Sequence, residues 1–437
     1  MKSAWYLAAT AIAAAASPHP AYGQQQPLDA LSSSQPNHLG SSQRDIDHII
    51  NDSPLLSFHR DLVSIESISG NEHDVGIFVA RFLEARNFTV IKQEVPPVEK
   101  NQTNTPKPRY NIYAYPASRS EPPSILLTSH IDTVPPFIPY SASQDSQKSN
   151  DPENPVLAGR GSVDAKGSVA AQIFAALDTL HEHPAAPLGL LFVVGEEIGG
   201  DGMKTFSDSA LNTRSAFDTI VFGEPTEAAL VAGHKGMVGF QVLVHGKAAH
   251  SGYPWLGHSA VSALLPALAR VDVLGNIPAN LGGLPSSPKY GPTTLNIGVV
   301  RAGVATNVVP AAAMADVAVR LAAGTPDEAR GIISRAVADA THDVDADVVV
   351  DFTSHRESYP PQDMNTDVEG FDVITVNYGT DVPNLSVRPG VKRYLYGPGS
   401  IFVAHGDHEA LTSREIQDAV VGYKKLIDSA LARQSSA

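Results

Sequence analysis

Residues Ser124–Asp132, which read Ser-Ile-Leu-Leu-Thr-Ser-His-Ile-Asp, decide the fold. The apolar run at their start is short and bounded by polar residues, as is typical of a strand buried on both faces. Similar runs follow at Leu188–Val194 and Thr219–Phe222, and Lys166–His181 has the Ala and Leu spacing of a helix. Strands that alternate with helices predict an α/β fold with a mainly parallel sheet covered by helices on both faces.

The segment after Glu224 has a different order of elements. We expect a strand, a helix, two strands, a helix and a strand, at Val238–His245, Ser259–Val271, Thr293–Val300, Ala313–Leu321, Pro326–Ala340 and Asp347–Phe352. This βαββαβ order is that of a ferredoxin-like unit. We therefore predict an inserted domain at 231–350 that divides the α/β domain into two parts, 45–230 and 351–437.

Composition excludes several classes of protein. The chain has 437 residues, a formal net charge of −15 and no cysteine. The acidic balance argues against nucleic acid as a partner, because such binding depends on Lys and Arg that neutralise phosphates. Without cysteine there are no disulfides, thiolate metal ligands or cysteine nucleophiles. Any metal ion must therefore be held by His, Asp and Glu.

The N-terminus has the features of a secretory signal peptide, predicted at 1–23. Lys2 precedes an apolar run, Ala4–Ala16, and Ala21–Gly23 supplies small residues for cleavage. The run is shorter than the roughly 20 residues of a spanning helix, so we expect no membrane span and a secreted, extracellular protein. Residues 24–44 are polar and predict a flexible leader. Four Asn-x-Ser/Thr sequons suit a secreted glycoprotein: Asn51, Asn87, Asn101 and Asn384.

Polar side chains gather where the predicted strands end. His130 and Asp132 follow the first strand, Glu196 and Glu197 the second, and Glu224 the third. Ligands in open α/β sheets bind beyond these carboxyl ends. Each residue alone also suits a structural role, such as a hydrogen-bonded histidine or a solvated turn. Together, however, grouped carboxylates without a cation would be strongly destabilised by mutual repulsion and by desolvation.

Oxygen and imidazole donors suit Zn²⁺, with Mn²⁺ or Co²⁺ as substitutes. A carboxylate has two oxygens, so one Asp can bridge two ions, and paired ions are a known hydrolytic arrangement. A glutamate that is not a ligand can then move the proton. The adjacent Glu196 and Glu197 could divide these two duties.

Five motifs in this order resemble a known family: His130-x-Asp132, Gly161-x-x-Asp164-x-Lys166-Gly167, Gly195-Glu196-Glu197, Gly223-Glu224-Pro225 and Ala404-His405. The family is that of the zinc metallopeptidases acetylornithine deacetylase, succinyl-diaminopimelate desuccinylase, aminoacylase and glutamate carboxypeptidase. The resemblance extends over nearly all of the chain from about residue 45. It implies a zinc-peptidase-like catalytic domain with an inserted lid or dimerisation domain.

The resemblance also implies a ligand set for two zinc ions. One ion would be bound by His130 and Glu224. The other would be bound by Glu197 and His405. Asp164 would bridge the two ions. His408 is the alternative to His405, but only His405 directly follows an apolar run and matches the family position.

Further roles follow from the same resemblance. Glu196 would be the general base, and Asp132 would orient His130. His250 would stabilise the oxyanion, often from the partner subunit in relatives. Asn307 and Arg320 would hold the substrate, since a guanidinium fork binds both oxygens of a carboxylate. The structural alternatives are a surface salt bridge for Arg320 and a capping role for His250.

These inferences predict a secreted zinc-dependent hydrolase that cleaves an amide bond next to a free carboxylate. A metallocarboxypeptidase acting on peptides is favoured, because a secreted enzyme meets extracellular peptides more often than biosynthetic intermediates. An N-acyl-amino-acid deacylase has the same motifs and stays open. A secreted aminopeptidase or a catalytically silent metal-binding protein is less favoured. The inserted domain could form a homodimer across a two-fold axis.

Overall fold

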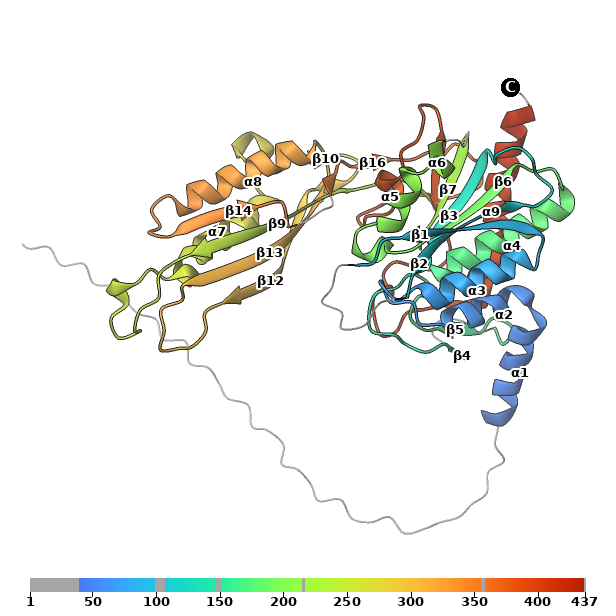
Figure 1. Ribbon diagram of the computed structural model, residues 1–437, viewed down its shortest axis with the longest axis horizontal. Coiled ribbons are helices and arrows are strands. Elements are labelled where there is room, and N and C mark those ends of the chain that lie inside the picture. Colours follow the sequence, from blue (N-terminus) through green and yellow to red (C-terminus); the bar gives the residue numbers. More distant parts are fainter. Residues whose placement is uncertain (1–38, 99–106, 146–150, 214–216, 355–357, 436–437) are drawn as a thin grey trace, which may run out of the picture.

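The chain forms two lobes joined by extended segments in the computed structural model (Figure 1). The structure describes residues 39–98, 107–145, 151–213, 217–354 and 358–435. The predicted signal peptide 1–23 and the sequon at Asn101 lie outside these residues. Within the described part, no helix is both long and apolar enough to cross a bilayer.

Helix α1 (Leu39–Asp52) begins inside the stretch predicted as a flexible leader, 24–44. Its side chains Ile46 and Ile50 are 2% exposed and belong to the core of the larger lobe. Burial of these two side chains holds the helix against the larger lobe. The first helix therefore begins before residue 45, within the polar stretch.

The larger lobe is built on a six-stranded sheet. Its strands lie in the order β1 (Phe88–Val95), β2 (Arg109–Pro116), β6 (Leu188–Val193), β3 (Ile125–His130), β7 (Thr219–Gly223) and β18 (Lys392–Tyr396). The last four strands are parallel, and β1 and β2 form an antiparallel edge. The predicted mainly parallel sheet is confirmed. The edge strand β1 was not predicted, because it is half polar and has no continuous apolar run.

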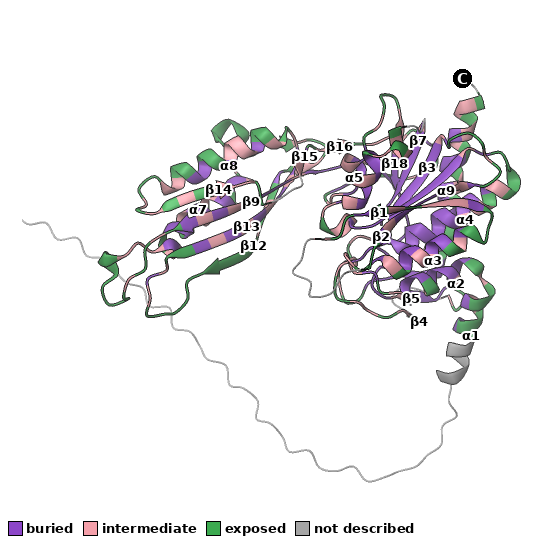
Figure 2. Ribbon diagram, viewed as in Figure 1, coloured by how far each residue is buried: buried purple, intermediate pink, exposed green. Residues whose placement is uncertain are grey.

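Both faces of this sheet are covered, and its strands are buried (Figure 2). Alternate side chains point to opposite faces, so Ile125 and Leu127 belong to one core and Leu126 to the other. The first core is covered by α2 (Pro54–Val63), α3 (His73–Glu84), α4 (Lys166–Glu182) and α9 (Ser413–Ser435). The second is covered by α5 (Asp201–Ser207), α6 (Ala210–Thr213) and a small sheet of β16 (Gln362–Asp363), β8 (Leu230–His234) and β17 (Val373–Val376).

Short elements complete the larger lobe. A second small sheet consists of β19 (Ala410–Thr412), β5 (Val156–Ala158) and β4 (Ser141–Ser143). Two 3-10 turns, η1 (Glu196–Ile198) and η4 (Val382–Asn384), lie near the carboxyl edge of the main sheet. Of the described sequons, Asn51 and Asn87 are exposed, whereas Asn384 is half-buried and donates to Asp381.

The smaller lobe has the predicted βαββαβ order. Its elements are β9 (Gly236–His245), α7 (Ala260–Leu274), β12 (Thr294–Ala302), β13 (Ala312–Leu321), α8 (Pro326–Thr341) and β14 (Asp347–Asp351). The strands lie in the order β12-β13-β9-β14 and all pairs are antiparallel. The helices close a separate apolar core against the sheet. Minor elements are η2 (Pro254–Leu256), η3 (Ala279–Leu281), β10 (Ser286–Ser287), β11 (Gly291–Pro292) and β15 (Ser358–Tyr359).

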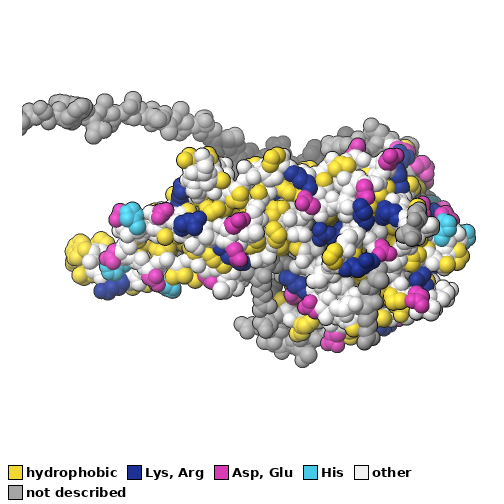
Figure 3. Space-filling view, turned by 90° about the horizontal axis from the view of Figure 1, so that it is seen from above, with side chains coloured by type: hydrophobic (Ala, Val, Ile, Leu, Met, Phe, Trp, Pro, Cys, Tyr) yellow, Lys and Arg dark blue, Asp and Glu magenta, His cyan; other side chains and the backbone are white. Residues whose placement is uncertain are grey.

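The smaller lobe projects as a narrow body from the larger one (Figure 3). On the face drawn, Lys and Arg side chains lie among Asp and Glu side chains. The strand β9 starts at the junction and runs ten residues outward, so its two ends are about 30 Å apart at 3.3 Å per residue. Residue 231, the predicted start of the inserted domain, lies in β8, and residue 350 lies in β14.

His234 at the junction is a buried histidine. Its ring contacts the carbonyl of Lys235 at 2.8 Å and the Thr380 hydroxyl at 3.0 Å. Burial lowers the pKa of His234 to about 4. In the unfolded chain a histidine binds its proton near pH 6.5, so protonation below that pH favours the unfolded state. The stabilisation that neutral His234 provides is therefore fully present above about pH 6.5 and is lost as the pH falls toward 4.

We expect the metal-free wild-type protein to lose about 2 kcal/mol more stability than His234→Gln between pH 7 and pH 5. Glutamine can accept a hydrogen bond from the same Thr380 hydroxyl, but it does not titrate. Thermal unfolding of both proteins at several pH values measures the difference. Parallel pH profiles would show that His234 does not supply this dependence.

Candidate metal centre

The candidate site lies at the carboxyl edge of the main sheet, where the strand order reverses. The chain passes from β3 to its neighbour β6 and then returns across β3 to β7. Such a switch point leaves a crevice for ligands beyond the strand ends. His130 is the last residue of β3, η1 begins soon after β6, and Glu224 follows β7. The fold therefore brings the predicted motif residues to one edge.

Two groups of donor atoms share the carboxylate of Asp164. His130 Nε2 lies 3.0 Å from Asp164 Oδ1 and 3.9 Å from Glu224 Oε2. His405 Nε2 lies 3.3 Å from Asp164 Oδ2 and 3.1 Å from Glu197 Oε2. In each group the donor atoms lie within 4.8 Å of one another, close enough to hold one ion. The two oxygens of Asp164 thus face two different histidines, as a bridging carboxylate requires.

Electrostatics support a cation at these groups. Burial raises the pKa of Glu224 well above its ordinary value, and it raises the pKa of Glu197 as well. Hydrogen bonds to Asp164 and Glu197 raise the pKa of His405 to about 10. Burial alone would lower the pKa of His130, but contacts with Asp132, Asp164 and Glu224 raise it. These shifts mean that the cluster without a cation binds protons more readily than isolated side chains would, and metal ions displace such protons when they bind.

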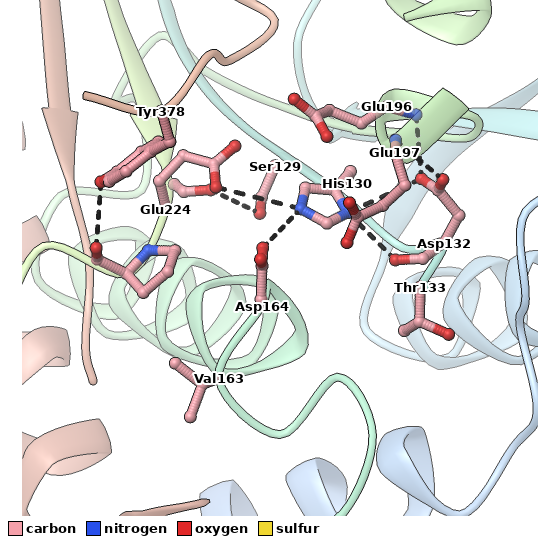
Figure 4. Close-up of polar contacts among 12 residues, drawn as sticks. Ser129, His130, Asp132, Thr133, Val163, Asp164, Glu196, Glu197, Glu224 and Tyr378 are labelled. Atoms are coloured by element: carbon pink, nitrogen blue, oxygen red, sulfur yellow. Dashed lines mark hydrogen bonds and ion pairs between the residues drawn. The ribbon is translucent and has the colours of Figure 1, made fainter. Parts of the chain in front are cut away.

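The adjacent carboxylates of Glu196 and Glu197 lie in different places. Only Glu197 belongs to a donor group. The Glu196 carboxylate lies to one side of the cluster (Figure 4). Burial and the charge of Glu224 raise the pKa of Glu196 well above its ordinary value. One of the two adjacent carboxylates thus belongs to a donor group and the other lies beside it.

Asp132 makes a different contact from the one expected. The ring of His130 uses Nδ1 to bond the backbone carbonyl of Asp132 at 3.0 Å, whereas the nearer carboxylate oxygen is 3.6 Å away. That carboxylate instead accepts the N–H groups of Glu196 and Glu197 at 3.1 and 3.2 Å and the Ser69 hydroxyl at 2.7 Å. Asp132 therefore holds the turn that carries both glutamates, as well as contacting the histidine.

His405, and not His408, belongs to a donor group of the structure. The side chain of His408 is 70% exposed and pairs with Asp407 at 3.1 Å. His405 has a φ of 64° and lies in a turn that follows Tyr396, the end of β18. The apolar residues before it form this turn, and Phe402 is 87% exposed. A left-handed residue in an irregular turn gives no periodic signal in the sequence.

Sequence reasoning missed the buried charges that support the ligands. Arg109 pairs with Glu72 at 3.4 Å, and both side chains are almost fully buried. Gly195 has a φ of 74°, and a Cβ on it would collide with the Arg109 guanidinium. Arg160, which pairs with Glu409, directly precedes the Gly161-x-x-Asp164 motif. The Asp164-Ala165 peptide is cis.

Of the three site residues predicted in the inserted domain, only Arg320 faces the crevice. It lies at the junction end of β13 and lines a cleft of 970 Å³ together with Asp164, Glu197, Glu224 and His405. His250 and Asn307 are exposed at the opposite end of β9, where Ser251 N–H donates to the carbonyl of Asn307. Within one chain the structure does not bring these two residues to the metal centre.

The α/β lobe with paired carboxylate and imidazole donors, together with the inserted βαββαβ lobe, defines the architecture of a metallopeptidase. Residues 232–345 match the peptidase dimerisation domain family of M20 enzymes. The chain is 63% identical to a probable carboxypeptidase of Aspergillus oryzae, over 99% of this chain and 100% of the relative. The chain therefore belongs to the M20 metallopeptidase family, and it is a peptidase.

Solved structures show the same fold. An M20 family metallo-carboxypeptidase from Sulfolobus solfataricus has a TM-score of 0.62 at 14% identity, with 86% of this chain and 98% of that chain covered. A dinuclear metal-binding M20 peptidase from Bacillus subtilis has a TM-score of 0.58 at 14% identity, with 89% and 99% covered. The predicted family and fold class are confirmed.

Proposed function

We propose that the protein is a zinc-dependent metallocarboxypeptidase that removes C-terminal residues from peptides. The observation that carries the proposal is the carboxylate of Asp164, whose two oxygens face His130 and His405 in two separate donor groups. The names of its relatives support the same activity, because they are probable carboxypeptidases.

The donor set fits two divalent ions of the zinc type. His130, Asp164 and Glu224 would hold one, and Asp164, Glu197 and His405 the other. Imidazole nitrogens with carboxylate oxygens suit zinc, and Mn²⁺ or Co²⁺ accept the same donors. When bound, the ions supply Lewis-acid chemistry, which polarises the carbonyl and lowers the pKa of water to about 7.

Glu196 is placed to move the proton. Its backbone N–H donates to Asp132, and burial and the charge of Glu224 raise the pKa of its carboxyl, which therefore takes up a proton more readily than an ordinary glutamate. Glu196 would take a proton from the attacking water and deliver it to the leaving amine. The second step completes the cleavage, because a peptide nitrogen leaves readily only when it is protonated.

Arg320 provides the anchor for a substrate carboxylate. Among the described residues, the contact found for its guanidinium is a weak one to the sulfur of Met237 at 3.7 Å, and no carboxylate pairs with it. A half-buried guanidinium in the cleft that holds the metal donors can therefore bind an anion. This arrangement suits a substrate with a free carboxylate beside the amide, which a peptide C-terminus supplies.

His250 and Asn307 would complete the site from a second subunit. The tip that carries them lies about 30 Å from the junction, and it is part of the segment that matches the dimerisation domain. The N–H of Gly252 donates to His250 Nδ1 at 3.0 Å, so a neutral ring carries its proton on Nε2. An Nε2–H group is the donor that an oxyanion needs.

Secretion is a further part of the proposal. Its support is the charged and then apolar N-terminus with small residues at a cleavage position. Exposed sequons at Asn51 and Asn87 are consistent with a glycoprotein.

A substrate panel tests the proposed function. We expect the zinc-loaded protein to cleave dipeptides and longer peptides with a free C-terminus, and to lose this activity on chelation and regain it with zinc. Arg320→Met should lower kcat/KM for these substrates by roughly 10–100-fold, the value of a hydrogen-bonded charge pair. The same variant should differ little from wild type on peptides with an amidated C-terminus.

Arg301→Met is the matched control, because Arg301 is an exposed arginine on β12 of the same lobe. It should cleave free-acid peptides as the wild type does. Faster cleavage of N-acyl amino acids than of peptides would identify a deacylase instead. Equal cleavage of free and amidated peptides would favour an aminopeptidase.

A further inference from the structure

A buried ion pair lies directly behind the metal centre. Arg160 Nη1 and Glu409 Oε2 are 2.7 Å apart, and the two side chains are 2% and 1% exposed. Arg160 lies in the loop between β5 and α4, and Glu409 immediately precedes β19. The pair thus joins two segments that are far apart in the sequence. It lines none of the cleft surface, so it has no direct contact with substrate.

Each member of the pair is bonded to the backbone of a donor segment. Glu409 Oε1 accepts the N–H groups of Val163 and Asp164 at 3.0 and 3.1 Å. Arg160 Nη2 donates to the carbonyl of His405 at 3.3 Å. The pair therefore holds the shared donor, Asp164, and one terminal donor, His405, in a fixed relation.

The two donor groups depend on this contact to different degrees. His130 ends a fully buried central strand, and Glu224 directly follows another. Both positions are set by the main sheet. His405, by contrast, lies in a turn outside any helix or strand, and its side chain is 54% exposed. Its backbone needs an attachment that the sheet does not supply.

We infer that Arg160 and Glu409 are positioning residues that hold the Glu197–His405 donor group together around Asp164. The inference rests on the proposed function, since it assumes that the two donor groups bind cations. Loss of the pair would leave the His130–Glu224 group close to its native geometry. The Glu197–His405 group would lose a fixed distance between two of its three donors, and its affinity for a cation would fall first.

Glu409→Gln is the most direct test. Glutamine keeps the size of the side chain and an oxygen that can accept hydrogen bonds from the two N–H groups, but it removes the negative charge that binds Arg160. Arg160→Lys is the second variant. Lysine keeps the positive charge, but a single ammonium cannot reproduce the fixed fork that reaches both Glu409 and the His405 carbonyl. Glu415→Gln is the control, since Glu415 caps helix α9 through Thr412 and touches no donor residue.

The measurement is a calorimetric titration of each metal-free protein with Zn²⁺, combined with thermal unfolding. The wild type and Glu415→Gln should bind two ions. In Glu409→Gln and Arg160→Lys the second ion should bind roughly 10–100-fold more weakly, as loss of a supporting hydrogen bond does at other metal sites. The first ion should bind as in the wild type. Excess zinc should restore kcat without a change in KM for the peptide.

The outcomes separate this inference from the proposed function. If the wild type does not bind two ions, both are wrong. If the wild type binds two ions and both variants do so with unchanged affinity, only the positioning role is wrong. An equal loss of affinity for both ions, in a variant that also unfolds at lower temperature, would likewise overturn it, because that is the effect of a general loss of stability.

Discussion

Replacing Glu196 with glutamine is expected to lower kcat by about 10²–10⁴-fold, the usual contribution of a general acid or base. The amide keeps the shape of the side chain, but it cannot accept and return a proton. Because the Glu196 carboxylate lies beside the donor groups and not within them, the variant should still bind two zinc ions. Steady-state kinetics and a zinc titration on the same sample measure the two effects.

Glu197→Gln provides the comparison at the neighbouring position. Glu197 contacts His405 at 3.1 Å within the second donor group, so its loss should weaken zinc binding, and excess zinc should recover part of the activity. The two variants thus differ by one position but should have opposite signatures. Near-normal activity of Glu196→Gln, or zinc loss in that variant, would show that the duties of the two glutamates are wrongly assigned.

Mixing two inactive variants is expected to restore activity. His250→Ala removes the proposed oxyanion donor and should lower kcat by about 10²–10³-fold. Consider a two-fold dimer that contains one His250→Ala subunit and one Glu196→Gln subunit. One of its two sites is complete, because the first subunit supplies an intact Glu196 and the second supplies an intact His250. After the subunits are exchanged at equal amounts, about a quarter of wild-type activity should return.

His258→Ala is the control for this experiment. His258 is a half-exposed histidine of the same lobe that pairs with Asp345 at 2.8 Å, and it should retain activity without a partner variant. Separation by size before and after mixing shows whether dimers form. Dimers that exchange subunits without regaining activity would mean that His250 does not act across the subunit interface.

Much of the fold was open to prediction because its signals are local. Buried parallel strands are continuous apolar runs, as in the Ser124–Asp132 stretch, and the two lobes differ in the order of their elements. The motif residues were also identifiable, since the ends of such strands meet at one edge of the sheet. The antiparallel strand β1 and the start of helix α1 at Leu39 were missed, because their polar residues give weak periodic signals.

The sequence by itself determined the α/β lobe with its inserted domain and the residues available as metal donors, because backbone periodicity and residue type are properties of short segments. The three-dimensional packing was needed to show which oxygen of Asp164 faces which histidine, and that the carboxylate of Asp132 holds the turn of Glu196 and Glu197. The same is true of the Arg160–Glu409 pair, whose members lie 249 residues apart. Such contacts form only when distant segments are packed together, and no local pattern encodes the distance between them.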